Sequence, residues 1–139
     1  MLHQGSNFNL VENNTAYDNV DNFVIFQSQF NVVRSNIWRD AKETNIRINE
    51  PADMNYIIGN TISGCKKGIF LYGGVARTVI QKNKIATKGL VLVLRTGSDG
   101  VIFTDNQITK PAFRFKDAKN IIIENNTVTS LTTSASQGN

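Results

Sequence analysis

The stretch NYIIGNTIS at 55–63 decides the fold, because close copies of it recur along the chain. The clearest are TVIQKNKIA at 78–86, VIFTDNQIT at 101–109 and IIIENNTVT at 121–129, with looser copies NLVENNTAY at 9–17 and NVVRSNIWR at 31–39. One asparagine holds the same place in every copy: Asn14, Asn36, Asn60, Asn83, Asn106 and Asn126. The gaps between them are 22, 24, 23, 23 and 20 residues. A fixed period in this range is typical of a stacked solenoid.

The residues around each asparagine alternate at period two and are rich in Val, Ile and Phe, which favours strands over helices. The sequence therefore predicts an all-β fold, a parallel β-helix (solenoid) of about six coils. Identical amides stacked about 4.8 Å apart can hydrogen-bond along the column. We expect the six asparagines to form an internal structural ladder, and we expect the recurrent asparagine to adopt the left-handed backbone of a turn.

Two columns flanking the asparagine are predicted to point into the core. The column three residues before it is Val11, Val33, Ile57, Ile80, Phe103 and Ile123. The column two residues after it is Ala16, Trp38, Ile62, Ile85, Ile108 and Val128. In the second coil Ile37 lies one place early, and a slip of one residue there would exchange the inward and outward faces.

A further strand follows each asparagine by roughly seven to twelve residues. Its inward set is predicted as Ile46, Ile48, Ile69, Leu71, Leu90, Leu92, Leu94, Phe113 and Phe115, with the alternate residues facing out. In the first coil Phe23 and Ile25 compete with Val24 and Phe26 for the inward positions, and the pattern leaves both alternatives open.

The chain of 139 residues, 40% of them apolar, fits one domain. We expect a flexible N-terminus at 1–6, a parallel β-helix at 7–130 and a polar, loose C-terminal tail at 131–139. Solenoids need caps because their ends expose apolar residues and strand edges. No capping segment is evident in the sequence, so a fragment, or one piece of an assembly, is expected.

Composition argues against several classes of function. The single Cys65 excludes an internal disulfide and is expected to be a small buried hydrophobe, and no metal or redox cluster is visible, so we expect no metal and no cofactor. No signal peptide and no membrane insertion are expected. The net charge is +4, but no dense basic patch or nucleic-acid motif accompanies it, so we expect no nucleic-acid partner.

The outward face of the last strand column gathers cations and aromatic rings. Arginine binds carboxylates and sulfates through two parallel hydrogen bonds, and an exposed ring offers a platform for a sugar. The predicted glycan-binding residues are Arg47, Phe70, Tyr72, Arg95, Arg114 and Lys116. The alternative is that these residues are ordinary solvated strand positions.

The position four before each asparagine is apolar in every coil, although it should face outward. Contiguous exposed apolar stripes usually mark interfaces. The predicted oligomer interface is therefore Leu10, Val32, Tyr56, Val79, Ile102 and Ile122. Other copies of the chain, or a further part of a longer protein, would cover this stripe.

These repeats resemble the right-handed parallel β-helix repeats of the pectate-lyase-like superfamily, over about residues 7 to 130. The resemblance is specific for fold and weak for function. Within the superfamily the chain is most similar to a segment of a bacteriophage tailspike or appendage. That similarity implies a homotrimer in a virion tail or extracellular location, with a bacterial surface polysaccharide as its partner. The alternatives are a polysaccharide lyase or glycoside hydrolase, and a structural solenoid without a ligand.

The resemblance to lyases and hydrolases directs attention to bases that lie beside carboxylates. The only carboxylates that share one outward strand column, Glu12 and Glu124, lie five coils apart, about 24 Å, and cannot act as a pair. The remaining weak catalytic candidates are Arg95, Asp99, Arg114 and Asp117. Surface pairs of this kind are commonly ordinary salt bridges, so whether the chain is an enzyme stays open.

Overall fold

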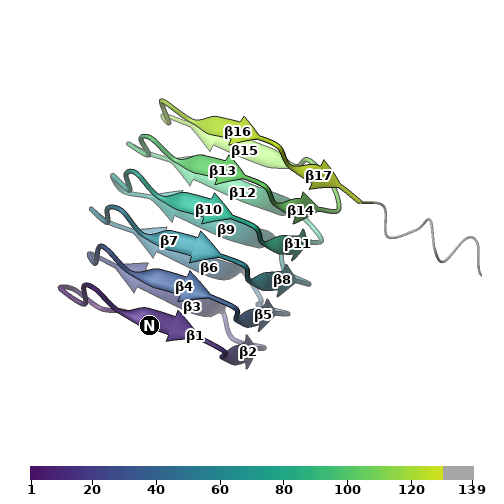
Figure 1. Cartoon of the computed structure of the whole chain (residues 1–139), viewed down its shortest axis with the longest axis horizontal. Helices are drawn as coiled ribbons and strands as arrows, with labels where there is room; N and C mark the ends of the chain where they lie inside the picture. Colours follow the sequence, from purple (N-terminus) through teal and green to yellow (C-terminus); the bar gives the residue numbers. More distant parts are fainter. Residues whose placement is uncertain (130–139) are drawn as a thin grey trace, which may run out of the picture.

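The computed structural model describes residues 1–129, which form one column of stacked coils with no helix among them. Each complete coil contains three strands that belong to three separate sheets. The described residues make five complete coils and two strands of a sixth, as Figure 1 shows. The predicted parallel β-helix is therefore confirmed. The predicted loose tail at 131–139 lies outside the described residues.

The strands of sheet 1 are β1 (Leu10–Glu12), β4 (Val32–Arg34), β7 (Tyr56–Ile58), β10 (Val79–Gln81), β13 (Ile102–Thr104) and β16 (Ile122–Glu124). Those of sheet 2 are β2 (Thr15–Tyr17), β5 (Ile37–Arg39), β8 (Thr61–Ser63), β11 (Lys84–Ala86), β14 (Gln107–Ile108) and β17 (Thr127–Val128). Those of sheet 3 are β3 (Asp21–Phe26), β6 (Thr44–Asn49), β9 (Lys67–Tyr72), β12 (Leu90–Arg95) and β15 (Phe113–Lys116).

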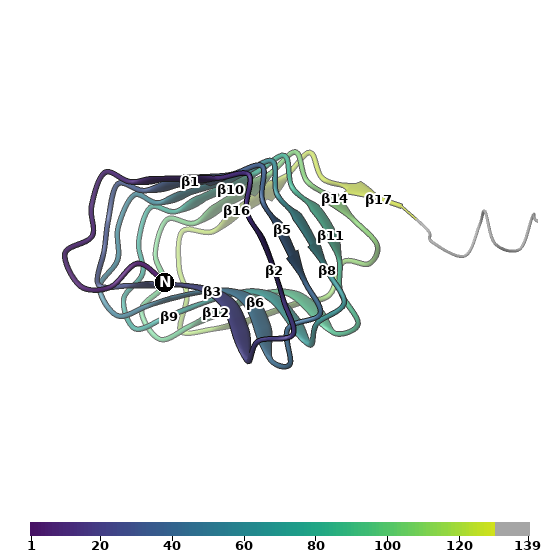
Figure 2. The same ribbon diagram turned by 90° about the horizontal axis from the view of Figure 1, so that it is seen from below.

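Every strand pairs with its counterparts in the adjacent coils in parallel and in register. For example, Ile80 lies between Ile57 and Phe103. Viewed along the column, sheets 1 and 3 lie on opposite sides of the cross-section, and sheet 2 connects them on a third side, as Figure 2 shows. Equivalent residues of successive coils therefore form straight columns along the axis.

Both inward columns beside the asparagine are buried in the middle of the molecule. Val33, Ile57, Ile80 and Phe103 are fully buried, as are Trp38, Ile62, Ile85 and Ile108 to within a few per cent. Trp38 faces inward while Ile37 is exposed, so the second coil keeps its register and has not slipped. In the last coil the same two columns emerge into solvent, since Ile123 is 39% exposed and Val128 is 54% exposed.

Sheet 3 resolves the alternatives in the first coil and corrects one outward position. Phe23 and Ile25 pair with Ile46 and Ile48 and belong to the core, so they are the inward residues. Val91, predicted to face outward, instead belongs to the core cluster. Leu90, predicted to face inward, lies outside the core cluster and pairs with Lys67. The carbonyl oxygen of Val91 would lie 2.7 Å from a Cβ on Gly68. The absence of a side chain at Gly68 lets the two backbones come this close.

The asparagine ladder is confirmed by its hydrogen bonds. The Oδ1 atom of Asn83 accepts from the backbone N–H of Asn60 at 2.8 Å and from its Nδ2 at 3.1 Å. The same pair of bonds joins every step from Asn14 to Asn126. Four of the six asparagines are about 1% exposed.

The expectation of a left-handed backbone at the ladder asparagine is wrong by one residue. The residue before each asparagine has positive φ instead: Asn13, Ser35, Gly59, Lys82, Asp105 and Asn125. This arrangement leaves the asparagine free to aim its amide along the column.

A second, shorter asparagine ladder precedes sheet 1 and was not predicted. Asn31 donates from its backbone N–H and its Nδ2 to Oδ1 of Asn55, and Asn9 does the same to Asn31. In the next two coils Thr78 and Val101 occupy the position of this asparagine. The carbonyl oxygen of Thr78 accepts from Ile102 N–H of the following coil, as the carbonyl oxygen of Asn55 accepts from Val79 N–H. The ladder stops at the third coil for lack of an amide.

Candidate functional site

The six predicted glycan-binding residues all lie on the outer face of sheet 3. Arg47, Phe70, Val93 and Arg114 occupy one row across the strands. Asn49 and Tyr72 pair in the next row, which continues to Arg95 and Lys116. Because strands of one sheet are about 4.8 Å apart, each row presents one side chain at about that interval along the axis.

The middle of this face is an aromatic platform. The rings of Phe70 and Tyr72 are 4.7 Å apart between centroids, and the Lys67 amine lies 5.4 Å from the centre of the Phe70 ring. Val93, on the next strand, is buried. Arg95, Arg114 and Lys116 are exposed beyond it. The platform is therefore followed along the axis by three cations.

Two polar atoms on the same face are buried without a hydrogen-bond partner. They are Nε of Arg47 and Oδ1 of Asn49. Nη2 of Arg47 lies 3.3 Å from Oδ2 of Asp21, and this ion pair holds the guanidinium in place. Nε of Arg47 has no hydrogen-bond partner. Asn49 is 8% exposed and pairs in register with Tyr72. Buried polar groups are rarely left unpaired, so these two atoms mark unsatisfied polar positions beneath the outer surface of sheet 3.

The structure does not bring the four weak catalytic candidates together as acid and base. Asp99 lies in the corner after β12, 3.8 Å from Lys119, and accepts a hydrogen bond from Asn120. Among residues 1–129, no ion pair joins Arg95 or Arg114 to Asp99 or Asp117. Within the described residues the four candidates therefore form no ion-paired group with one another.

That corner is instead a ladder of alternating charge. Arg77 makes a bidentate contact with Asp53 of the previous coil. The Asp53 carboxylate raises the pKa of the Arg77 guanidinium, and Asp99 on the next coil adds to this effect. Because the charges alternate from coil to coil, this corner is internally neutralised and offers little to an anion.

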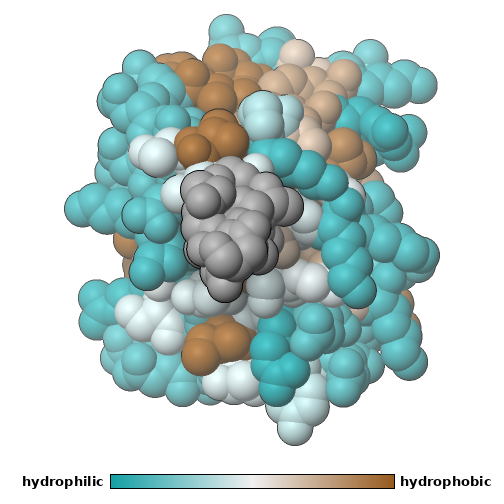
Figure 3. Space-filling model, turned by 90° about the vertical axis from the view of Figure 1, so that its right-hand side faces the viewer, coloured by the Kyte–Doolittle hydropathy of each residue, from teal (hydrophilic) through white to brown (hydrophobic). Residues whose placement is uncertain are grey.

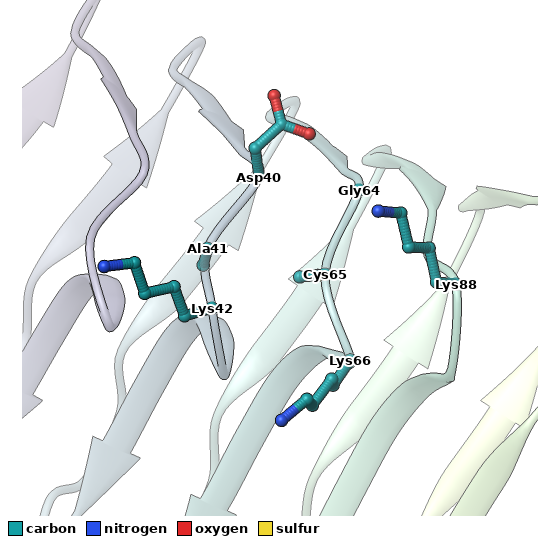
Figure 4. Close-up of a pocket in the computed structure, with 7 residues that line it drawn as sticks. All are labelled: Asp40, Ala41, Lys42, Gly64, Cys65, Lys66 and Lys88. Carbon is teal, nitrogen blue, oxygen red and sulfur yellow. The ribbon is translucent and has the colours of Figure 1, made fainter.

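A column of lysines at the opposite corner was missed by the sequence analysis. Lys42, Lys66 and Lys88, on three successive coils, line a depression of about 330 Å³ around the turn at Gly64 and Cys65, as Figure 4 shows. Lys110 continues the column, and its amine donates to the carbonyl oxygen of Lys88 at 2.7 Å. The gaps between the four lysines are 24, 22 and 22 residues, which match the coil period. This spacing in the sequence could have predicted the lysine column.

The main carboxylate contact of this lysine column is at Glu43. Lys66 approaches its Oε1 to 2.7 Å and Lys67 approaches its Oε2 to 3.9 Å. The hydrogen bond from Lys66, together with that amine's charge, lowers the pKa of Glu43. A second carboxylate, Asp40, also lines the depression, but it lies 3.0 Å from Arg39, so the lysines leave a positive surface along the edge where the strands of sheet 3 begin.

Cys65 lines the same depression but is not a reactive group. Its thiol is buried, and Nδ2 of Asn45 lies 2.9 Å from its sulfur. Burial raises the pKa of the Cys65 thiol to about 11, so the thiol is protonated near neutral pH. The expectation of a small buried hydrophobe is confirmed.

Within residues 1–129 no group of three or more His, Cys, Asp and Glu side chains could hold a metal ion. The same residues include no helix long and apolar enough to cross a membrane.

The chain forms stacked coils with three sheets of parallel strands and an asparagine ladder at the turn between sheets 1 and 2. This arrangement fits the parallel β-helix of the pectate-lyase-like type. The chain belongs to the NosD family, whose model, described as periplasmic copper-binding protein (NosD), matches residues 1–110. No curated protein matches the chain.

Proposed function

We propose that this chain is a glycan-binding β-helix that holds an anionic bacterial polysaccharide along the outer face of sheet 3. The observation that carries the proposal is the Phe70–Tyr72 platform with the exposed cations Arg95, Arg114 and Lys116 beyond it. A sugar ring can stack on the platform while its acidic groups meet the exposed cations further along the axis.

The cations around the platform favour an anionic polymer over a neutral one. Arg95, Arg114 and Lys116 lie further along the axis, and the lysine column borders the edge where the strands of sheet 3 begin. A chain of uronates or other acidic sugars running parallel to the axis would meet a contact at about every 4.8 Å. This interval is close to the length of one sugar residue.

The family description supports a location in the bacterial envelope. A periplasmic protein meets envelope polysaccharides, as the proposed function requires. The narrower assignment to a phage tailspike in a virion tail remains a prediction from the sequence. The homotrimer formed through the apolar stripe of sheet 1 is likewise a proposal, and its test is given in the Discussion.

The copper in the family description does not enter the proposal. Copper prefers thiolate, thioether and imidazole ligands. The only cysteine in the chain, Cys65, is buried and protonated, and His3 packs on the Phe26 ring at 5.3 Å. Among residues 1–129 no group of three or more His, Cys, Asp and Glu side chains could hold a metal ion, so these residue types do not provide a copper site there.

The test measures binding of alginate and polygalacturonate to the whole chain and to two variants. Tyr72→Ala should weaken binding at least tenfold with little change in its salt dependence, because stacking is not screened. Arg114→Ala should weaken binding and flatten the salt dependence, because it removes one charge-assisted contact.

The matched controls are Tyr17→Ala and Arg34→Ala, since Tyr17 is exposed on sheet 2 and Arg34 on sheet 1, away from the proposed face. Both should bind like the unmodified chain. Equal affinity of Tyr72→Ala and Tyr17→Ala would refute the proposed face. A loss confined to Lys66→Ala and Lys88→Ala would move the ligand to the lysine column.

A further inference from the structure

The two ends of the column differ in a way that bears on assembly. At one end β15, β16 and β17 are the last strands of their sheets, and no residue among 1–129 pairs with their outer edges. Inward-facing residues are uncovered there, including Phe115, Ile123 and Val128. Figure 3 shows apolar atoms gathered at the top, where the last coil lies, above a mostly hydrophilic face.

The opposite end is open in two sheets and covered in the third. β1 and β2 are the first strands of sheets 1 and 2, and nothing in the described chain pairs with their outer edges. The edge of β3 is covered, because Leu2 N–H donates to Val24 O at 2.8 Å and Phe26 N–H donates to Leu2 O at 2.9 Å. The segment around Leu2 therefore occupies the place of a strand of sheet 3.

Within residues 1–129 the two ends contribute different strands of a coil. The sixth coil supplies β16 and β17 to sheets 1 and 2 but, within residues 1–129, no strand to sheet 3. The segment around Leu2 supplies a strand position to sheet 3 alone. If one copy is placed above another, β16 and β17 complete a coil with the Leu2 segment of the next copy.

The hydrogen-bonding groups at the two ends also match in direction. Along the ladder each asparagine donates from its backbone N–H and Nδ2 to Oδ1 of the next, so the Asn126 N–H has no acceptor within the described chain. Oδ1 of Asn14 accepts nothing there, although its amide donates to Asn36. In the middle of the column, the first residue of each sheet 2 strand donates its N–H to the carbonyl oxygen of the ladder asparagine in the preceding coil, as Thr127 does to Asn106. Thr15 N–H has no such acceptor within the described chain, and Asn126 O of another copy could supply it. Donors at one end face acceptors at the other.

We propose that two copies of this chain stack head to tail, with β16 and β17 of one copy pairing in parallel with β1 and β2 of the next. A two-fold contact of like ends would instead make the strands antiparallel, and it would not continue the parallel register or the asparagine ladder of the coils. Head-to-tail contacts do not close on themselves, so stacked copies extend into a filament as the protein concentration rises. This proposal goes beyond glycan binding, and it lengthens the face of sheet 3 along the same axis.

The test is disulfide trapping with the whole chain. Thr15 and Thr127 lie in the same outward column of sheet 2, at opposite ends, and would become register partners at the junction. Within one copy they are five coils apart, about 24 Å, which is too far for a disulfide. Thr15→Cys and Thr127→Cys are purified separately, mixed and oxidised with diamide. Cys65 is buried and protonated, so it stays out of the reaction.

The mixture should yield heterodimers at least tenfold in excess of the dimers formed by either variant alone. Adding Val128→Asp to Thr127→Cys should abolish the heterodimer, because a charge would face the apolar end of the next copy. The matched control Ile37→Asp, at an exposed position in the second coil, should leave the heterodimer unchanged.

Dimers of Thr127→Cys alone, formed as readily as heterodimers, would replace head-to-tail stacking by a two-fold contact. Only monomers in the oxidised mixture, together with a constant molar mass in light scattering across concentrations, would overturn the proposal. The readouts are independent of the glycan, so failure here leaves the proposed function standing.

Discussion

The ladder asparagine shows what one residue contributes to this fold. Asn83 takes part in six hydrogen bonds: two accepted by its Oδ1 from Asn60, two donated to Oδ1 of Asn106, one donated to the carbonyl oxygen of Ile57, and one accepted by its backbone carbonyl oxygen from Gln107 N–H. The groups concerned are buried, so each lost bond leaves a polar atom without water.

Replacing Asn83 with Leu, which has nearly the same shape, should lower the free energy of unfolding by about 2 to 4 kcal/mol, because amide groups of Asn60 and Asn106 would lose partners. Urea unfolding measures the change. Lys84→Leu, on the exposed outer face of β11, is the control and should change stability by less than about 0.5 kcal/mol. Equal unfolding midpoints would contradict the role given to the ladder.

The ladder was predictable because one residue type recurs at the coil period. The left-handed positions were not, because the residue before each asparagine has no common chemistry. Ser35, Gly59, Lys82 and Asp105 take the same positive φ although their side chains share nothing. Parallel pairing above and below imposes the conformation there, and local propensity does not reveal it.

Strands of one column are equivalent in sequence pattern but differ in how well the neighbouring coils cover them. Ile57 in β7 is fully buried between Val33 and Ile80. Ile123 in β16 has a neighbour on one side within the described chain and is 39% exposed.

Ile57→Ala should therefore cost about 3 to 5 kcal/mol, whereas Ile123→Ala should cost about 1 kcal/mol in dilute solution, because the last coil leaves less of a cavity behind. Thermal or urea unfolding at low protein concentration gives both values. Similar costs for the two variants would show that another part of the protein covers the last coil.

Alternation along strands predicted the face of sheet 3, with the exception of Val91, whose neighbour Gly68 changes the local geometry. The lysine column escaped prediction because it lies in corners, where no alternation places a side chain. Lys42, Lys66 and Lys88 come together only through stacking. The unmatched Nε of Arg47 and Oδ1 of Asn49 depend on the packing of neighbouring side chains, which spacing alone cannot show.

For the whole molecule, the outer stripe of sheet 1 raises the question of lateral contacts. Leu10, Tyr56 and Ile122 are exposed, and Val79 and Ile102 between them are half-buried. All lie in one register column. A homotrimer that buries this stripe remains a proposal, distinct from stacking at the ends.

Val79→Lys combined with Ile102→Lys should convert a trimer to monomers in light scattering and leave the β-sheet circular dichroism largely intact, since neither side chain belongs to the core. The control pair Thr61→Lys and Gln107→Lys places the same charges on the outer face of sheet 2 and should leave the molar mass unchanged. A monomeric unmodified chain at all concentrations would refute the lateral interface.

The uniform parallel register has a consequence for how such a chain can change length during evolution. A duplication or deletion of one whole repeat, 22 to 24 residues in the middle of this chain, restores every column above and below the junction. A change by an odd number of residues inside a strand would turn its apolar side chains toward water. Genes of this kind should therefore gain and lose length in steps of one coil, and the reach of the molecule along a polymer should vary in the same steps.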